Sequence, residues 1–324
     1  MSGGKQVLLA EPRSLCAGVR RAIAIIDLAL EQHGAPIYVR KEIVHNHHVV
    51  REFQRRGVVF VDSEQEVPEG ALCVFSAHGV SPQVRQNAEA RGLDVLDATC
   101  PLVAKVHQEA RRFARDGRTL LLVGHADHEE VEGTFGHAPD QTIIIETAAD
   151  AEALDLPADA PVAYLTQTTL SVDETRDIIA VLQRRFTDLR GPATDDICFA
   201  SQNRQDGIRA VVDRCDLVLV VGSTNSSNSI RMVEVARRLG GRAELVPDVT
   251  HFDPAWLAGV NTVGVSAGAS APEVLVDELV DRLASLGYGD VAVHRVATED
   301  VVFSPPARLT GVADGAVTDR DRTR

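Results

Sequence analysis

The sequence alternates between short apolar runs and amphipathic stretches over nearly its whole length, and this alternation restricts the chain to an α/β fold. Runs of four or five apolar residues are typical of buried strands, whereas apolar residues spaced three or four apart indicate helices. Because short connections join them, we expect parallel strands covered by the helices. The expected strands are 35–39, 71–75, 119–123, 162–165, 217–221 and 262–265, and the expected helices are 19–32, 82–91, 103–115, 172–186, 204–213, 230–239 and 272–286.

The same order of elements occurs three times, and each pass begins with a cysteine that opens a helix. The three segments read SLCAGVRRAIAII, ATCPLVAKVHQEA and DICFASQNRQDGI. Each helix leads to a strand and a polar loop, with the sequences RKEIVHNHH, GHADHEEVEGT and GSTNSSNS. A further strand in each pass ends in a second polar loop, SAHGVSP, TQTTLSV or SAGASAP. Each pass covers roughly 80 to 100 residues, which is within the usual range of a domain.

This repeat predicts three similar α/β domains with mainly parallel sheets, in a trefoil-like pseudo-threefold arrangement around a central cluster. The predicted domains are 17–99, 100–197 and 198–290, and a strand within 5–16 is expected to join the third. Residues 291–324 are predicted to form a C-terminal extension that is disordered from 314 onward. Ligands of parallel sheets bind at the carboxyl ends of the strands, so three cysteines and six polar loops should meet in one cavity.

Composition and charge exclude several classes of function. The formal net charge of -14 argues against nucleic-acid binding, because nucleic-acid binders usually present a basic face. No apolar run approaches the roughly 20 residues that span a bilayer. The N-terminal apolar stretch of four residues is too short for a signal peptide, so we expect a cytoplasmic protein without a membrane partner. In such a compartment the five cysteines remain thiols and do not form a disulfide framework.

The five cysteines fall into two groups. Cys73 lies in an apolar strand and Cys215 at a helix-to-strand junction, and both are interpreted as packing residues. Cys16, Cys100 and Cys198 each adjoin a helix start, where backbone N–H groups stabilise a thiolate. Three such thiolates suit zinc or an iron–sulfur cluster. Structural zinc sites usually contain close cysteine pairs, which these three lack, but the spacing alone leaves both metals open.

Several polar loops suit an anionic ligand. His45 and His78 follow two strands in equivalent loops, and imidazoles donate N–H bonds to phosphate oxygens. The segment Ser226-Ser227-Asn228-Ser229 precedes a helix, where hydroxyl, amide and backbone N–H groups form an anion seat. Ordinary N-capping explains one residue of this segment but not the whole group. Ser270, in SAGASAP, allows the same two interpretations.

A proton donor is expected in the loop HADHEEVEG. One carboxylate in an enclosed pocket can keep a raised pKa and donate a proton, but the residues alone do not choose among Glu129, Glu130 and Glu132. Thr168 and Thr169, in TQTTLS, can relay a proton or orient a water molecule.

Taken together, these segments resemble the 4-hydroxy-3-methylbut-2-enyl diphosphate reductase family, which acts last in the non-mevalonate isoprenoid pathway. The resemblance extends from about residue 8 to 305 and rests on PRSLCAGVRRAI, GAPIYVRKEIVHN, FSAHGVS, DATCPLV, GHADHEEVEGT, TQTTLSV, DDICFASQNRQ, GSTNSSNS and SAGASAP, which occur in the family's order.

The resemblance implies reductive dehydroxylation of the allylic diphosphate to isopentenyl and dimethylallyl diphosphate at a [4Fe–4S] cluster with one open iron. An external one-electron donor such as a ferredoxin or flavodoxin would supply the electrons. The implied cluster ligands are Cys16, Cys100 and Cys198. Glu130 is the implied proton source, with Thr168 beside the substrate hydroxyl and His128 facing the pocket. The implied substrate-binding residues are His45, His78, His128, Gln167, Thr168, Ser226, Ser227, Asn228 and Ser270.

Two other functions are compatible with the same cysteines. A cluster-containing hydro-lyase also uses an open iron but needs no net electrons, so turnover without a reductant would identify it. A zinc-binding or redox-sensing protein would have no need for the loops that suit a diphosphate, and its metal content would identify it.

Overall fold

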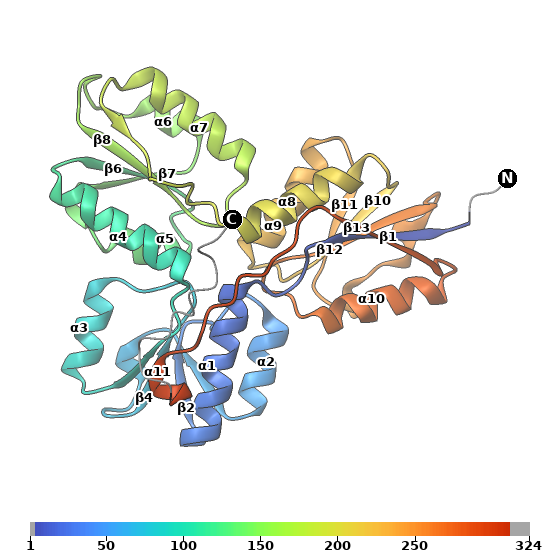
Figure 1. Ribbon diagram of the computed structural model, residues 1–324, viewed down its shortest axis with the longest axis horizontal. Helices are drawn as coiled ribbons and strands as arrows, with labels where there is room; N and C mark the ends of the chain where they lie inside the picture. Colours follow the sequence, from blue (N-terminus) through green and yellow to red (C-terminus); the bar gives the residue numbers. More distant parts are fainter. Residues whose placement is uncertain (1–3, 312–324) are drawn as a thin grey trace, which may run out of the picture.

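The computed structural model describes residues 4–311, in which three α/β lobes surround a common centre (Figure 1). Each lobe is built on its own sheet, and every pair of neighbouring strands is parallel. The predicted fold class of three similar α/β units with parallel sheets is therefore confirmed.

The first lobe contains a four-stranded sheet in the order β3-β2-β4-β5. Its strands β2 and β4 were predicted, whereas the edge strands β3 and β5 were not. The elements are α1 (Ala17–His33), β2 (Ile37–Arg40), α2 (His47–Arg55), β3 (Val58–Val61), the 3-10 turn η1 (Glu64–Glu66), β4 (Leu72–Phe75), α3 (Pro82–Ala90) and β5 (Asp94–Asp97).

The second lobe repeats this plan with the strand order β7-β6-β8-β9. Again the two inner strands are the predicted ones. The elements are α4 (Pro101–Arg115), β6 (Thr119–Val123), α5 (Glu129–Phe135), η2 (Pro139–Gln141), β7 (Thr142–Ile145), α6 (Ala148–Ala153), β8 (Val162–Thr166), α7 (Val172–Arg185) and β9 (Leu189–Arg190).

The third lobe has a five-stranded sheet in the order β11-β10-β12-β1-β13, so it joins the two ends of the chain. Strand β1 (Gln6–Glu11) pairs with both β12 and β13. All of strand β13 except Asp290 lies in the range predicted above as the C-terminal extension. The other elements are α8 (Phe199–Val212), β10 (Leu217–Val221), α9 (Ser227–Arg238), β11 (Ala243–Val246), η3 (Val249–His251), η4 (Pro254–Leu257), β12 (Thr262–Ala267), α10 (Glu273–Ser285) and β13 (Asp290–Arg295).

Each sheet has hydrophobic cores on both faces, which explains why the inner strands are mostly apolar. In the third lobe every residue of β10 is buried, and its side chains alternate between two hydrophobic cores. Leu219 contributes to the core on one face, together with Leu279 of α10, and Val220 to the core on the other, together with Met232 of α9. Such double-sided burial is typical of parallel sheets covered by helices.

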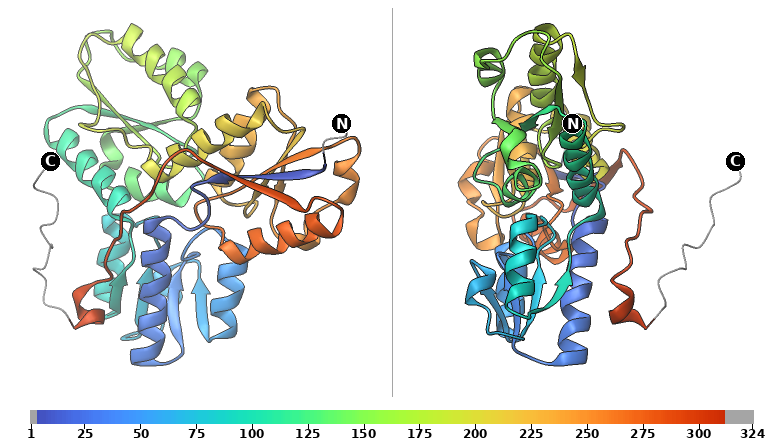
Figure 2. Two further views of the ribbon diagram at one scale, coloured as in Figure 1. Left: turned by 45° about the vertical axis from the view of Figure 1, so that its right-hand side comes forward. Right: turned by 90° about the vertical axis from the view of Figure 1, so that its left-hand side faces the viewer.

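Residues 296–306, called here the C-terminal strap, lead from β13 in the third lobe to the first lobe (Figure 2). The short helix α11 (Ala307–Thr310) then packs beside α1, where Leu309 is buried in the core of the first lobe. Gln32 of α1 donates a hydrogen bond of 2.6 Å to the carbonyl oxygen of Leu309. The predicted disorder from residue 314 lies outside the described residues.

Within residues 4–311, none of the helices has the combination of length and hydrophobicity required to cross a membrane.

A glycine permits the close contact between the first and second lobes. Gly79 follows β4 with a φ of +78°, and a Cβ atom built on it would lie 2.6 Å from Cε1 of His107 in α4. We expect Gly79→Ala to lower the free energy of unfolding by about 2–4 kcal/mol, because left-handed strain and a buried clash add together. Urea unfolding measures this change.

Gly92→Ala is the matched control, since its φ is +63° and no atom lies within 4 Å of its added Cβ. This control should cost only about 1 kcal/mol, and an equal loss in both variants would refute the predicted clash.

The same contact predicts a pH-dependent stability. His107 is 4% exposed, and its ring centroid lies 4.3 Å from that of His137. Burial lowers the pKa of His107 from its ordinary 6.5 to about 3 in the folded protein. Below pH 6.5 the unfolded chain therefore takes up a proton that the folded chain does not, and stability falls with pH. Between pH 6.5 and 5, His107 should account for a loss of about 2 kcal/mol. Denaturation at pH 6.5 and at pH 5 should show a smaller loss of stability in His107→Gln than in the wild-type protein. The exposed control His33→Gln should show the same loss as the wild type.

Candidate active site

A cavity of about 100 Å³ lies where the three lobes meet, and helix starts and polar loops of all three line it. It brings together all the site residues predicted above except Gln167, which is buried behind the lining and bonds to Ser227. The predicted residues that line the cavity are Cys16, His45, His78, Cys100, His128, Glu130, Thr168, Cys198, Ser226, Ser227, Asn228 and Ser270.

Each of the three cavity cysteines is the N-cap of a long helix, α1, α4 or α8. Each is also anchored in the same way to a loop after a strand. The backbone N–H groups of Cys16, Cys100 and Cys198 donate bonds of 3.0, 3.0 and 3.1 Å to one carbonyl oxygen in each of the loops SAGASAP, SAHGVSP and TQTTLSV. Each lobe therefore provides the loop that anchors one cysteine, and the contact repeats with threefold regularity.

Burial controls the acidity of the thiols in the cavity. It raises the pKa of Cys100 to about 12 and that of Cys198 to about 11. Bonds from backbone N–H groups at the helix starts lower both pKa values, but less than burial raises them. A helix start alone thus does not produce the thiolates anticipated from the sequence. Thiolates at these positions would need further stabilisation, such as a bound cation provides.

The arrangement of the sulfurs fits a cluster better than a single ion. Among residues 4–311, the one set of at least three His, Cys, Asp or Glu ligand atoms that all lie within 4.8 Å of one another is His45, His78 and Glu129. The three cavity sulfurs are thus not all this close, whereas a tetrahedral zinc ion would hold its sulfurs roughly 3.8 Å apart. Gly18 allows the Cys100 sulfur to lie close to the start of α1, because a Cβ built there would lie 2.7 Å from that sulfur. The donor set therefore fits an iron–sulfur cluster held by three cysteines.

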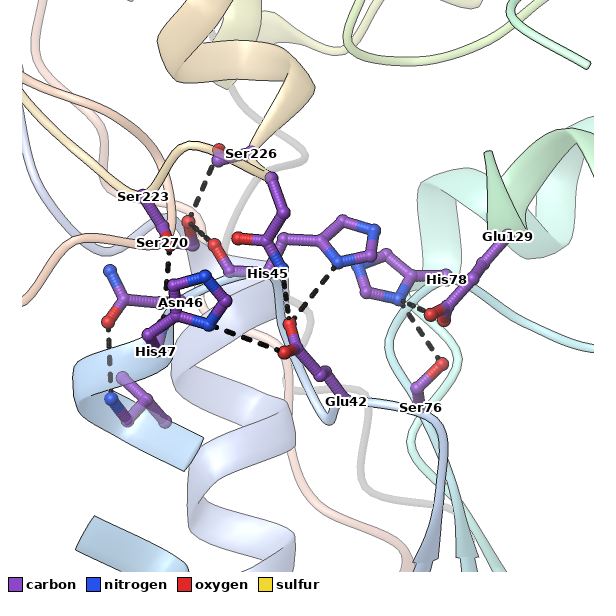
Figure 3. Close-up of polar contacts among 12 residues, drawn as sticks. Glu42, His45, Asn46, His47, Ser76, His78, Glu129, Ser223, Ser226 and Ser270 are labelled. Atoms are coloured by element: carbon purple, nitrogen blue, oxygen red, sulfur yellow. Dashed lines mark hydrogen bonds and ion pairs between the residues drawn. The ribbon is translucent and has the colours of Figure 1, made fainter. Parts of the chain in front are cut away.

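Two stacked histidines form one wall of the cavity (Figure 3). The ring centroids of His45 and His78 lie 3.9 Å apart, and Nδ1 of His78 lies 3.0 Å from a carboxylate oxygen of Glu129. Glu42, on the loop before His45, lies 3.6 Å from Nδ1 of that histidine. Burial is the main cause that lowers the pKa of His78, so its ring is neutral at neutral pH.

The ring of His128 presents an N–H group to the cavity. Its Nδ1 accepts a hydrogen bond of 3.1 Å from the backbone N–H of Glu130, so the proton of the neutral ring lies on Nε2. Burial lowers the pKa of His128 to about 2. Its Nε2 is buried and has no hydrogen-bond partner in the described part of the chain. A buried N–H group without a partner is well suited to receive a ligand oxygen.

Hydroxyl and amide groups of the third lobe line the cavity beside His45, whose carbonyl oxygen accepts a bond of 2.9 Å from the Ser270 hydroxyl. Ser226 is the N-cap of α9, and its hydroxyl oxygen accepts bonds from the hydroxyls of Ser229 and Ser270 at 3.1 and 3.4 Å. The side chain of Asn228 accepts a bond of 2.8 Å from the backbone N–H of Ala269. N-capping thus accounts for Ser226, but it does not explain why the other hydroxyl and amide groups lie beside it. Their polar groups, beside the start of α9, can receive an anion.

The carboxyl group of Glu130 is buried, and both of its oxygens contact Thr168. The backbone N–H of Thr168 donates to Oε1 at 2.6 Å, and its hydroxyl donates to Oε2 at 2.8 Å. Burial raises the pKa of Glu130 to about 7, although the bonds from Thr168 lower it. This carboxyl group is therefore present in both protonation states near neutral pH, as proton transfer requires. Its neighbours differ, because Glu129 contacts His78 and the side chain of Glu132 is 56% exposed.

A wider cleft of about 830 Å³ adjoins the central cavity and shares His45, His128 and Ser227 with it. Lys41 and Arg231 line this cleft together with six acidic residues, Glu42, Asp62, Glu66, Asp127, Glu129 and Glu146. The cleft is therefore a polar opening beside the cavity whose carboxylates outnumber its lysine and arginine side chains.

The sequence analysis did not predict Ser201, a polar residue of the cavity. It did place Cys73 and Cys215 outside the site. Ser201 is fully buried, donates its backbone N–H to Sγ of Cys198 at 3.4 Å and lies 3.4 Å from the amide nitrogen of Asn228. It stands in the quoted motif DICFASQNRQ, where its position one helical turn after Cys198 was the available signal. Cys73 and Cys215 do not line the cavity. Cys73 of β4 is buried in a hydrophobic core of the first lobe, and Cys215 packs against a core of the third lobe that includes residues of α8.

Comparisons with known proteins identify the family. Residues 7–284 match the family model described as LytB protein. The 4-hydroxy-3-methylbut-2-enyl diphosphate reductase of Rhodococcus opacus (strain B4) is 56% identical over 308 residues, which cover 95% of this chain and 92% of the relative. The protein of the same name from Burkholderia pseudomallei (strain 1026b) is 54% identical over 305 residues, with coverages of 94% and 97%.

A solved structure agrees with the fold and the sequence. The E-1-hydroxy-2-methyl-but-2-enyl-4-diphosphate reductase from Plasmodium falciparum superposes with a TM-score of 0.92 at 34% identity. The match covers 95% of this chain and 98% of that chain. The resemblance found in the sequence is thus confirmed. The chain belongs to the LytB family of 4-hydroxy-3-methylbut-2-enyl diphosphate reductases and is an oxidoreductase.

Proposed function

We propose that the enzyme removes the hydroxyl group of (E)-4-hydroxy-3-methylbut-2-enyl diphosphate reductively and forms isopentenyl and dimethylallyl diphosphate. One observation carries the proposal: a single cavity holds three cysteine thiols, a buried carboxyl group of pKa about 7, and a group of histidine, serine and asparagine side chains. Reduction, protonation and anchoring of a diphosphate need these three kinds of group together.

In this proposal Cys16, Cys100 and Cys198 hold a [4Fe–4S] cluster with one iron open to the substrate. When bound, such a cluster supplies electrons and a Lewis-acidic iron for the hydroxyl oxygen. The electrons come one at a time from an external carrier protein such as a ferredoxin or flavodoxin. The three lobes enclose the cluster and limit the access of water to it.

The polar lining of the cavity anchors the diphosphate. The imidazoles of His45, His78 and His128 donate to it, and the remaining donors are Ser226, Ser227, Asn228 and Ser270, with Gln167 holding Ser227. The phosphate oxygens are anionic, so the hydrogen bonds that they accept from imidazole, hydroxyl and amide groups are charge-assisted. The anchored diphosphate fixes the distance between the allylic hydroxyl and the proton donor.

Glu130 and Thr168 act on the substrate hydroxyl. Glu130 in its protonated form delivers a proton as the C–O bond breaks, and water leaves. The Thr168 hydroxyl, which donates to Oε2 of Glu130 and belongs to a residue that lines the same cavity, orients the hydroxyl of the substrate. The reduction takes two electrons in all from the carrier protein, and a second proton, added to one or the other end of the allylic fragment, then gives the two products.

An anaerobic preparation tests the proposal. Iron, sulfide and zinc are measured per chain, and the hydroxylated diphosphate is assayed with a reduced viologen dye. We expect about four irons per chain and turnover that depends on the reductant. Turnover without a reductant would instead identify a hydro-lyase. Zinc in place of iron, with no turnover after cluster reconstitution, would identify a binding or sensing protein.

A further inference from the structure

Arg204 is a fully buried cation that links the segments carrying two of the cavity cysteines. It belongs to α8, which begins at the cap residue Cys198, and its side chain is 0% exposed. One terminal nitrogen donates to the carbonyl oxygen of Ala200 at 2.9 Å, and the other donates to that of Ser14. Ala200 follows Cys198 by two residues, and Ser14 precedes Cys16 by two. The guanidinium group therefore joins the two cysteine-bearing segments directly.

The segment around Ser14 needs such a link, because its backbone is strained. Ser14 has a φ of +62°, a region that residues other than glycine rarely adopt. Its hydroxyl donates to Glu273, and the backbone N–H groups of Ser14 and Cys16 donate to carbonyl oxygens of the last residue of β12 and of the loop after it. The bond from Arg204 is the contact that ties this strained segment to α8.

The C-terminal strap provides the counter-charge of this cation. Glu299 accepts bonds from both terminal nitrogens of Arg204, at 2.9 and 3.4 Å, and a further bond of 3.1 Å from Asn203. The side chain of Glu299 is only 11% exposed. A buried cation that loses its partner is strongly disfavoured and moves toward water if it can. Without Glu299, Arg204 would therefore release Ser14.

We propose that Arg204 and Glu299 are positioning residues that set the spacing between the thiols of Cys16 and Cys198. The C-terminal strap thereby becomes part of the support for the metal site, although it contributes no ligand. This inference rests on the proposed function in one respect, which is the identity of the group that the thiols hold. The spacing of the two segments is a property of the chain alone.

The test compares Glu299→Gln with a control on the same C-terminal region. Glu299→Gln keeps the size of the side chain but removes its charge. Arg308→Gln, in α11 after the strap, is the control, because it removes the exposed ion pair with Asp94. Hydrogen exchange of residues 14–18 is measured in the metal-free full chain. We expect exchange there to be roughly tenfold faster or more in Glu299→Gln, since charge-assisted bonds are lost, and unchanged in Arg308→Gln.

The cluster-loaded protein gives a second measurement. Loss of the negative charge of Glu299 leaves Arg204 without its partner near the thiols, so the reduction potential should become less negative in Glu299→Gln and not in Arg308→Gln. Wild-type exchange rates in Glu299→Gln, or an equal increase in both variants, would overturn the inference. If the wild-type chain binds no iron at all, the proposed function fails, while the exchange experiment still decides the role of Arg204 and Glu299.

Discussion

Replacement of Cys100 by serine is expected to remove most of the bound iron and to lower turnover by more than about 100-fold. Loss of an outer partner of a metal ligand already costs about 10–100-fold, so loss of a ligand costs more. Cys100 has no substitute nearby, because the cavity places one cysteine from each of three helix starts around its centre. Iron and sulfide analysis after anaerobic reconstitution, together with the viologen assay, measures the result.

Cys215→Ser is the matched control, since this cysteine packs in the core beside α8 and does not line the cavity. It should retain the iron content and turnover of the wild-type protein. Cys100→Ser with full iron content would show that the metal site does not use Cys100, and the ligand assignment would then be wrong. Thermal unfolding of both metal-free variants separates loss of the metal from loss of the fold.

The second large effect concerns Glu130. We expect Glu130→Gln to lower kcat by about 100- to 10,000-fold, which is the usual contribution of a general acid. The amide keeps the size of the side chain but cannot deliver the proton. Glu132→Gln, on the same first turn of α5 but with a 56% exposed side chain, should leave kcat unchanged. Near-full turnover in Glu130→Gln would contradict the assigned role.

The pH profile gives an independent check of Glu130. Its pKa is raised to about 7, so the proton-donating form predominates below that value and disappears above it. Wild-type kcat should therefore fall as the pH rises through about 7. The residual turnover of Glu130→Gln should lack this decline. A decline that persists unchanged in Glu130→Gln would show that another group titrates.

The inner strands of each sheet could be predicted because both of their faces are buried, whereas the edge strands could not. β10 reads as an unbroken apolar run, but β9 contains only two residues and all but one of the β13 residues are exposed. β13 owes its place to pairing with β1, which is distant in the sequence. Helix α8 was expected from residue 204 but begins at Phe199, because the Cys198 side chain caps its start.

The candidate site was accessible from the sequence where strand ends and helix starts carry reactive side chains. The order of the motifs pointed to the residues that line the cavity, and the resemblance to the family supplied roles that stay predictions. Other parts depend on long-range contacts that no local pattern reveals. Arg204 and Glu299 are 95 residues apart, and an arginine in a polar helix segment gave no sign that it would be fully buried. The choice among the three glutamates likewise depends on burial.

The position of β1 between β12 and β13 constrains when the site can form during protein synthesis. β1 leaves the ribosome long before its partners, because Gln6 pairs with Thr262 of β12 and Asp290 of β13, which lie 256 and 284 residues later. Until then the segment carrying Cys16 lacks the loop after β12 to which its backbone bonds. The first two lobes can fold earlier, as domains generally do during translation. Any metal group held by all three cysteines is therefore loaded after the chain is nearly complete, and a nascent or truncated chain offers at most two anchored thiols.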